Sequence, residues 1–252
     1  MATRRPLVAG NWKMHGNRVE TAALVATIRH GVDAFSVADV AVCPPFILIP
    51  LVAEKLAGGP VFWGGQNLST HKSGAYTGEI SGSMLKDYGC TYVIVGHSER
   101  RTLYGENDSL VAEKYGAAQA AELIPILCVG ETLQERESNR TEDVVARQLN
   151  AVIRAHGVSS FKHAVIAYEP VWAIGTGKTA TPEQAQDVHR FIRGRLAVMD
   201  KSVADGVRIL YGGSMKATSA GELLAQPDID GGLVGGASLS ADEFLSICRA
   251  AK

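Results

Sequence analysis

The chain has 252 residues, of which 46% are apolar and 20% are charged. This balance is typical of a folded globular protein, and the length suits either one large α/β barrel or two small domains. The formal net charge is −1. A charge so close to zero argues against nucleic acid or an anionic membrane as a partner held by bulk charge.

The cysteines and the N-terminus indicate where the protein works. Four cysteines, at positions 43, 90, 128 and 248, lie far apart and form no Cys-x-x-Cys pair. A disulfide scaffold is not expected in a chain of this length, so we predict a reducing compartment. Residues 11–13 interrupt the first apolar stretch, which is too short for a signal peptide, and no run approaches the ~18 apolar residues that span a membrane. The sequence therefore predicts a soluble, cytoplasmic protein.

Short apolar runs rich in β-branched residues recur along the chain, and a helical pattern follows each of them. We expect strands at residues 7–12, 40–43, 61–65, 92–95, 125–129, 164–168, 208–211 and 232–234. Runs this continuously apolar suit strands buried on both faces, as in a parallel sheet. Eight strand–helix units in about 250 residues match a (β/α)8 barrel. A doubly wound open sheet is the alternative, but it would normally have fewer strands or a second domain. We predict an α/β fold with a single (β/α)8 barrel domain over residues 1–252.

Several helix starts carry capping signals. Thr181 is expected to cap a helix that Pro182 opens, with Gln184 completing a capping box. Ser240 and Glu243 form a second predicted capping box, at the last helix, and Asn17 is expected to cap the first. The helix after Thr181 should turn one apolar face toward the core, formed by Ala185, Val188, Ile192, Leu196 and Met199.

The barrel prediction requires functional residues where strands end and loops begin. Polar residues follow the first, fourth and sixth predicted strands: Asn11 and Lys13, then His97, then Glu169. Glu169 is the candidate general base, because a base must be held within reach of the proton that it removes. A solvated loop carboxylate is the alternative for Glu169, as an exposed lysine is for Lys13 and a structural histidine for His97.

The segment after Glu169 is unusual for a surface loop. Residues 171–174 are apolar and precede Gly175, which favours a lid that closes over a ligand and expels water. A loop packed permanently on the barrel rim is the alternative. The segment also resembles two nucleotide-binding patterns, but Trp172 stands where a P-loop needs glycine, and the dinucleotide pattern does not follow its strand directly. No nucleotide cofactor is expected.

Glycine pairs at residues 212–213 and 235–236 follow the last two predicted strands. Glycine lets backbone N–H groups approach an anion closely, and the loops after strands seven and eight commonly bind phosphate in barrels. With Ser214 beside the first pair, both pairs together favour a phosphate site over two ordinary tight turns. Metal-ligand spacing is absent around the histidines, so no metal is expected.

These segments together resemble the triosephosphate isomerase family nearly end to end. The resemblance rests on residues 9–13, 96–101, 167–178, 211–214 and 232–236. It implies a TIM barrel without a cofactor that acts in glycolysis and gluconeogenesis on dihydroxyacetone phosphate and D-glyceraldehyde 3-phosphate. The chain departs from the family at His15 and at residues 137–140, which lack an expected glycine, so local loop geometry is in doubt there.

The resemblance also assigns roles to the matching positions. Glu169 would move a proton between the two carbons through an enediolate, and neutral His97 would polarise the carbonyl. Lys13 would stabilise negative charge, and Asn11 would orient the site. Backbone N–H groups would hold the phosphate, at Gly175, Ser214, Gly235 and Gly236.

The resemblance further implies a homodimer. The long segment that begins at residue 66 would reach the partner subunit, with Thr77 near the other chain's Asn11 and Glu79 near Arg100. A long loop without secondary structure is usually functional or disordered, which favours an interface over a plain surface excursion.

Two other functions fit a phosphate-binding barrel. An aldolase would need a lysine inside a strand, and Lys13 at a strand end is the only near candidate. A non-catalytic barrel would be expected to lack Glu169, His97 or Lys13, and all three are present.

Overall fold

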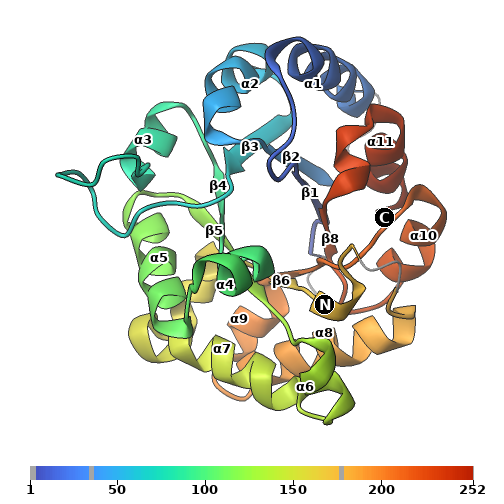
Figure 1. Ribbon diagram of the computed structural model, residues 1–252. Coiled ribbons are helices and arrows are strands. Elements are labelled where there is room, and N and C mark those ends of the chain that lie inside the picture. The colour runs from blue at the N-terminus through green and yellow to red at the C-terminus, as the bar shows by residue number, and fades with distance from the viewer. Residues whose placement is uncertain (1–3, 34–36, 176–178, 252) are drawn as a thin grey trace.

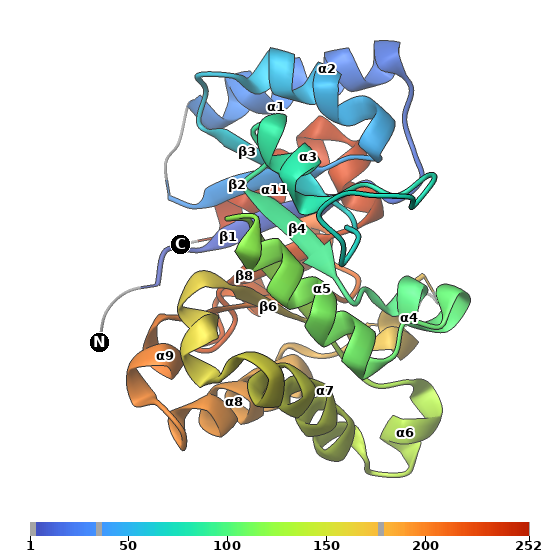
Figure 2. The same ribbon diagram turned by 90° about the vertical axis from the view of Figure 1, so that its left-hand side faces the viewer.

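The structure is a computed structural model that describes residues 4–33, 37–175 and 179–251. Eight parallel strands form a closed barrel in the order β1 to β8, and β8 pairs with β1 to close it. Figure 1 shows the strands enclosed by helices, and Figure 2 shows the same barrel after a 90° turn. The predicted (β/α)8 barrel is confirmed, and the doubly wound open sheet is wrong for this chain.

The strands agree with their predicted positions to within one residue at either end. They are β1 (Leu7–Asn11), β2 (Asp39–Cys43), β3 (Val61–Gly65), β4 (Tyr92–Val95), β5 (Ile124–Val129), β6 (Val165–Tyr168), β7 (Arg208–Tyr211) and β8 (Gly231–Val234). β-Branched, apolar runs of four to six residues favour extended backbone and tolerate burial on both faces.

Helices follow the strands and cover the outside of the barrel. They are α1 (Arg18–Asp33), α2 (Ile49–Leu56), α3 (Gly82–Asp87), α4 (Ser98–Tyr104), α5 (Asp108–Ala120), α6 (Leu133–Glu137), α7 (Thr141–His156), α8 (Pro182–Ala197), α9 (Lys201–Gly206), α10 (Ala217–Leu224) and α11 (Ala241–Ala250). Short 3-10 turns lie at η1 (Phe46–Leu48), η2 (Val158–His163), η3 (Val171–Ala173) and η4 (Gly236–Leu239).

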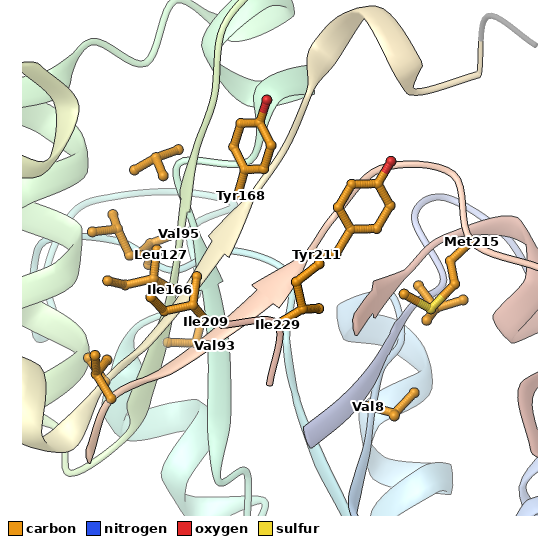
Figure 3. Packing of buried hydrophobic residues seen from close by; sticks show 14 of the residues in the cluster. Val8, Val93, Val95, Leu127, Ile166, Tyr168, Ile209, Tyr211, Met215 and Ile229 are labelled. Carbon is orange, nitrogen blue, oxygen red and sulfur yellow. The ribbon is translucent and has the colours of Figure 1, made fainter. Parts of the chain in front are cut away.

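The core has two layers because successive strand side chains alternate in direction. One cluster fills the barrel interior and comes almost wholly from strands, including Leu7, Ala9, Val165 and Ala167. The other lies between the strands and the helices and includes Val8, Ile166 and Tyr168. Figure 3 shows part of this outer layer, with Tyr168 and Tyr211 projecting from the neighbouring strands β6 and β7.

Two of the three predicted helix caps are confirmed. The side chain of Thr181 accepts from the N–H of Gln184, and the Gln184 side chain accepts in return from the N–H of Thr181. The side chain of Asn17 accepts from the N–H groups of Val19 and Glu20, each at 3.0 Å.

The capping box predicted at the last helix is wrong. α11 does begin after Ser240, but the Ser240 side chain makes no capping hydrogen bond. The Glu243 carboxylate instead accepts from the N–H of Ala217, the first residue of α10, at 3.2 Å. The first N–H groups of a helix have no partner within that helix, so α10 attracts the carboxylate.

Two smaller expectations are also resolved. Met199 lies beyond the end of α8 and is 45% exposed, so its place on the apolar face is wrong, whereas Ala185, Val188, Ile192 and Leu196 are buried. Asn139 adopts a left-handed backbone, with φ of 55°, just before α7. Asparagine tolerates this conformation better than most residues, so it can replace the missing glycine.

Candidate active site

A cavity of about 550 Å³ opens at the carboxyl ends of the strands. Its lining includes all eight residues that the sequence singled out, drawn from the ends of five different strands or the loops that follow them: Asn11, Lys13, His97, Glu169, Gly175, Ser214, Gly235 and Gly236. Residues up to 225 positions apart in the chain thus face one space. The structure brings the whole predicted set together.

Strand alternation directs two of these side chains into the cavity. Leu7 and Ala9 belong to the interior cluster, and Asn11 follows them with the same parity at the end of β1. Val165 and Ala167 are interior residues of β6, and Glu169 follows them in the same way. Because alternate residues of a strand point to the same side, both polar groups point into the barrel mouth.

Glu169 is 2% exposed and has two polar neighbours. One carboxylate oxygen lies 2.9 Å from Nε2 of His97, and the other accepts from the N–H of Ser98 at 2.8 Å. Burial by itself raises the pKa of Glu169, but His97 and the Ser98 N–H outweigh burial, so the net pKa lies below its ordinary value. The carboxylate is therefore ionised and can accept a proton.

His97 stands at the start of α4, immediately after Gly96, whose φ of 68° turns the chain out of β4. Burial lowers the pKa of His97, whereas the nearby Glu169 and Glu99 carboxylates together raise it by more, so the net direction of the pKa shift is upward. The N–H of Glu99 donates to Nδ1 at 3.2 Å. A nitrogen that accepts a hydrogen bond carries no proton, so this contact favours a neutral ring with its proton on Nε2.

Lys13 has a left-handed backbone, with φ of 53°, which is uncommon for a residue other than glycine. Side chains that the sequence analysis did not select hold it there. The Gln66 amide donates to the carbonyls of Lys13 and Cys43, each at 2.8 Å, and Nζ of Lys13 lies 2.5 Å from the Glu99 carboxylate. This contact occupies the Lys13 amino group, whereas an aldolase needs a lysine whose amine is free to attack a carbonyl.

Two glycines leave room for Glu169. A side chain at Gly130 would begin 1.7 Å from the carbonyl oxygen of Glu169, and one at Gly212 would begin 2.9 Å from its Cγ. Gly212 was selected as part of a phosphate loop, and the structure gives it this second, steric reason. Gly130 was missed, although a glycine directly after the strand β5 is the kind of signal that marks a close approach.

The phosphate-directed residues line the same cavity as the catalytic candidates. Gly236 has no neighbour within 4 Å of the position of an added Cβ, so its backbone borders open space. The N–H of Ser214 donates to the carbonyl of Ala173 at 3.2 Å. This donor is thus already engaged by the predicted lid. Gly175 ends the described part of that segment, and residues 176–178, which complete the stretch that resembles the family, lie outside the described residues.

The apolar part of the predicted lid is anchored by Glu131, which sequence reasoning also missed. The Glu131 carboxylate is fully buried and accepts from Trp172 Nε1 at 2.9 Å and from the Tyr168 hydroxyl at 3.1 Å. Its backbone carbonyl accepts from the N–H of Val171. In this conformation the segment therefore lies against the barrel rim.

The cysteines lie in the core and not in the cavity lining. The four cysteines are buried and free, and burial raises the pKa of each thiol above its ordinary range. Within the described ranges, no cluster of three or more His, Cys, Asp or Glu side chains is placed to hold a metal ion. Across residues 4–33, 37–175 and 179–251, no helix is long and apolar enough to cross a membrane.

A closed (β/α)8 barrel that gathers a buried carboxylate, an imidazole and a lysine at the carboxyl ends of its strands has the architecture of a barrel enzyme. A family model described as triosephosphate isomerase matches residues 6–251. The chain belongs to the triosephosphate isomerase family, whose members are isomerases.

Curated relatives match over nearly the whole chain. The triosephosphate isomerase of Thiobacillus denitrificans is 64% identical over 248 residues, which are 98% of this chain and 99% of that protein. The one from Nitrosococcus oceani is 62% identical with the same coverage. The one from Pseudomonas fluorescens is 58% identical over 249 residues, again 98% of this chain and 99% of the relative.

Proposed function

We propose that the chain interconverts dihydroxyacetone phosphate and D-glyceraldehyde 3-phosphate, with Glu169 as the base. The observation that carries this proposal is the buried Glu169 carboxylate beside His97, in a cavity that Gly235 and Gly236 also line. Removing a proton next to a carbonyl needs an ionised base and a donor to the developing oxyanion, and both are present. The reaction serves glycolysis and, in the reverse direction, gluconeogenesis.

His97 and Lys13 act on the carbonyl side of the substrate. In the structure, Nε2 of His97 lies 2.9 Å from the Glu169 carboxylate. When the substrate carbonyl accepts from Nε2 instead, His97 loses the Glu169 contribution that raises its pKa and keeps the Glu99 N–H on Nδ1. The neutral ring then polarises the carbonyl, while the Lys13 ammonium stabilises the enediolate charge and Asn11 orients the site.

The phosphate is held by backbone N–H groups of Gly175, Ser214, Gly235 and Gly236. Because Ser214 donates to Ala173 without ligand, phosphate must replace that carbonyl, and the exchange frees the lid at Ala173. A lid that then closes over the enediolate keeps water away and prevents loss of phosphate.

A coupled assay for interconversion of the two triose phosphates tests the function. In Glu169→Asp the base withdraws by about one methylene, so we expect kcat to fall about a hundredfold while KM changes little. Glu142→Asp, the same change at an exposed site on α7, should retain full activity. A folded wild-type protein without turnover contradicts the function, and a rise in KM alone contradicts Glu169 as the base.

We also propose a cytoplasmic homodimer that associates through the loops after β1, β2 and β3. Large apolar side chains are exposed on these loops, with Met14 at 93%, Ile47 at 86% and Tyr76 at 44%. Exposed apolar residues on three adjacent loops suit an interface better than solvent. The segment between β3 and α3 extends away from the barrel (Figure 1), and it carries Thr77.

A further inference from the structure

Ser238 lies directly behind the proposed phosphate wall, and its side chain is completely buried. It belongs to the short turn η4, two residues after Gly236. It does not line the cavity, unlike its neighbours Gly235, Gly236 and Ala237. A buried hydroxyl normally has a hydrogen-bond partner, and this partner defines what Ser238 does.

Both donors of Ser238 go to one atom. Its hydroxyl donates to the carbonyl oxygen of Gly235 at 2.7 Å, and its backbone N–H donates to the same oxygen at 2.8 Å. A carbonyl oxygen has two lone pairs, so both bonds form at once. The peptide group between Gly235 and Gly236 is therefore held at two points from its carbonyl side.

Because the peptide group is planar, fixing the Gly235 carbonyl also fixes the direction of the Gly236 N–H. No cis peptide bond occurs among the described residues, and in a planar trans peptide the C=O and the N–H point to opposite sides. The N–H in this peptide belongs to Gly236. With the Gly235 oxygen fixed toward Ser238, the Gly236 N–H points away from Ser238, and Gly236 itself lines the cavity.

Ser238 is itself fixed by its packing against β1. A side chain at Gly10 would begin 2.8 Å from Cβ of Ser238, so the backbone of β1 lies directly against it. Gly10 immediately precedes Asn11. Ser238 thus ties the position of the Gly235–Gly236 peptide to the strand that carries Asn11 and leads to Lys13.

We propose that Ser238 is a positioning residue for phosphate, because its hydroxyl locks the Gly235–Gly236 peptide with the Gly236 N–H aimed at the ligand. The proposal rests on the assignment of Gly236 to phosphate binding given above. Two hydrogen bonds on the Gly235 oxygen also polarise the peptide, which makes its N–H a stronger donor. Phosphate binding should therefore depend on a hydroxyl that never touches phosphate.

Ser238→Ala tests the role, because it removes the hydroxyl and keeps the backbone N–H bond to Gly235. We expect the inhibition constant of inorganic phosphate and the KM for glyceraldehyde 3-phosphate each to rise about fivefold, the effect of one hydrogen bond. We expect kcat to change less than twofold, because Glu169 and His97 are untouched. In ¹⁵N–¹H spectra, the shift of the Gly236 amide on phosphate addition should shrink in the variant.

Ser246→Ala is the matched control. The Ser246 hydroxyl also donates to a backbone carbonyl at 2.7 Å, that of Asp242, but within α11 and outside the cavity lining. It should leave phosphate inhibition unchanged. Should Ser238→Ala fold poorly, Ser238→Cys keeps the connectivity of the side chain and replaces the hydroxyl with a larger thiol that is a weaker donor, and a threefold rise in the phosphate inhibition constant is expected.

The outcomes separate this inference from the proposed function. If phosphate inhibits the wild type and its inhibition constant is the same in both Ser238 variants, the role of Ser238 is overturned and the proposed function stands. A loss confined to kcat also overturns it, because that result places Ser238 on the chemical step. A wild-type protein that neither binds phosphate nor turns over triose phosphate overturns the proposed function instead.

Discussion

Glu169 is confined by backbone on two sides. Gly130 lies against its carbonyl and Gly212 against its side chain, at distances that exclude a Cβ at Gly130 and crowd one at Gly212. The carboxylate therefore keeps its position through close packing as well as through the hydrogen bond from the Ser98 N–H and the contact with Nε2 of His97. Groups that must be placed to within a fraction of an ångström are commonly held by such packing.

Gly130→Ala should move the Glu169 backbone without changing the chemical identity of any residue that lines the cavity. A methyl group 1.7 Å from the Glu169 carbonyl cannot be accommodated without moving one of the two backbones. A displacement of about 1 Å lowers kcat roughly a hundredfold, and the free energy of unfolding should fall with it. Steady-state kinetics and urea unfolding measure both effects.

Gly194→Ala provides the control within α8, where an added Cβ meets nothing within 4 Å. Alanine in a helix should stabilise the protein by about 0.5–1 kcal/mol and leave kcat unchanged. Equal kinetics in the two variants would show that Gly130 has no role in placing Glu169.

At the scale of elements, α8 is attached to the barrel through a buried histidine. Nδ1 of His189 lies 3.1 Å from the carbonyl of Asp228, and its ring contacts the edge of Tyr168. Burial lowers the pKa of His189 to about 4. Protonation of this buried ring therefore destabilises the packing of α8 against the barrel.

The attachment predicts a pH-dependent stability. An unfolded histidine titrates near 6.5, so between pH 6.5 and 4 the unfolded chain binds a proton that the folded chain does not. Stability is therefore complete above pH 6.5 and decreases as the pH falls toward 4, with a loss of about 2 kcal/mol at pH 5. Urea unfolding at pH 8 and pH 5, at one protein concentration, measures it.

His189→Gln should abolish this component of the pH dependence, because glutamine does not titrate. His30→Gln changes an exposed histidine on α1 and should preserve it. The same loss of stability at pH 5 in His189→Gln as in wild type would assign the effect to other groups.

At the scale of the whole molecule, barrel closure places the loops after β1, β2 and β3 side by side, because these strands pair in order. The proposed dimer uses this group of loops. Arg100, expected to meet Glu79 of the partner, pairs with Glu106 of its own chain at 2.6 Å. The proposed dimer therefore requires the other guanidinium nitrogens of Arg100 to meet Glu79 of the partner.

Thr77→Arg tests the dimer. An unpaired charge placed at the centre of an interface should raise the dimer dissociation constant about thirtyfold or more, and activity should fall on dilution. Sedimentation velocity over a range of concentrations measures the association. Val198→Arg adds the same charge at an 89% exposed apolar residue after α8 and should leave association unchanged. A wild-type protein that is monomeric at every concentration contradicts the dimer.

Much of the fold was predictable because its signals are local. Apolar, β-branched runs gave each strand to within one residue, and Thr181 and Asn17 marked helix starts through hydrogen bonds spanning three residues. The capping box at Ser240 failed because its glutamate had a better partner on another helix, 26 positions away. A pattern of neighbouring residues cannot show that Glu243 has a second possible partner on a distant helix.

The sequence by itself determined the alternation of strands and helices, the barrel that eight such units form, and the residues at the strand ends. The hydrophobic periods of strands and helices, and the residues that favour turns, can be read from residues that are neighbours in the chain. Only the tertiary structure decided how those residues are held. The contacts that hold them join separate segments of the chain and exist only once the barrel has closed. They are those of Gln66 with Lys13, of Glu131 with the predicted lid, of Gly130 with Glu169 and of Ser238 with Gly10.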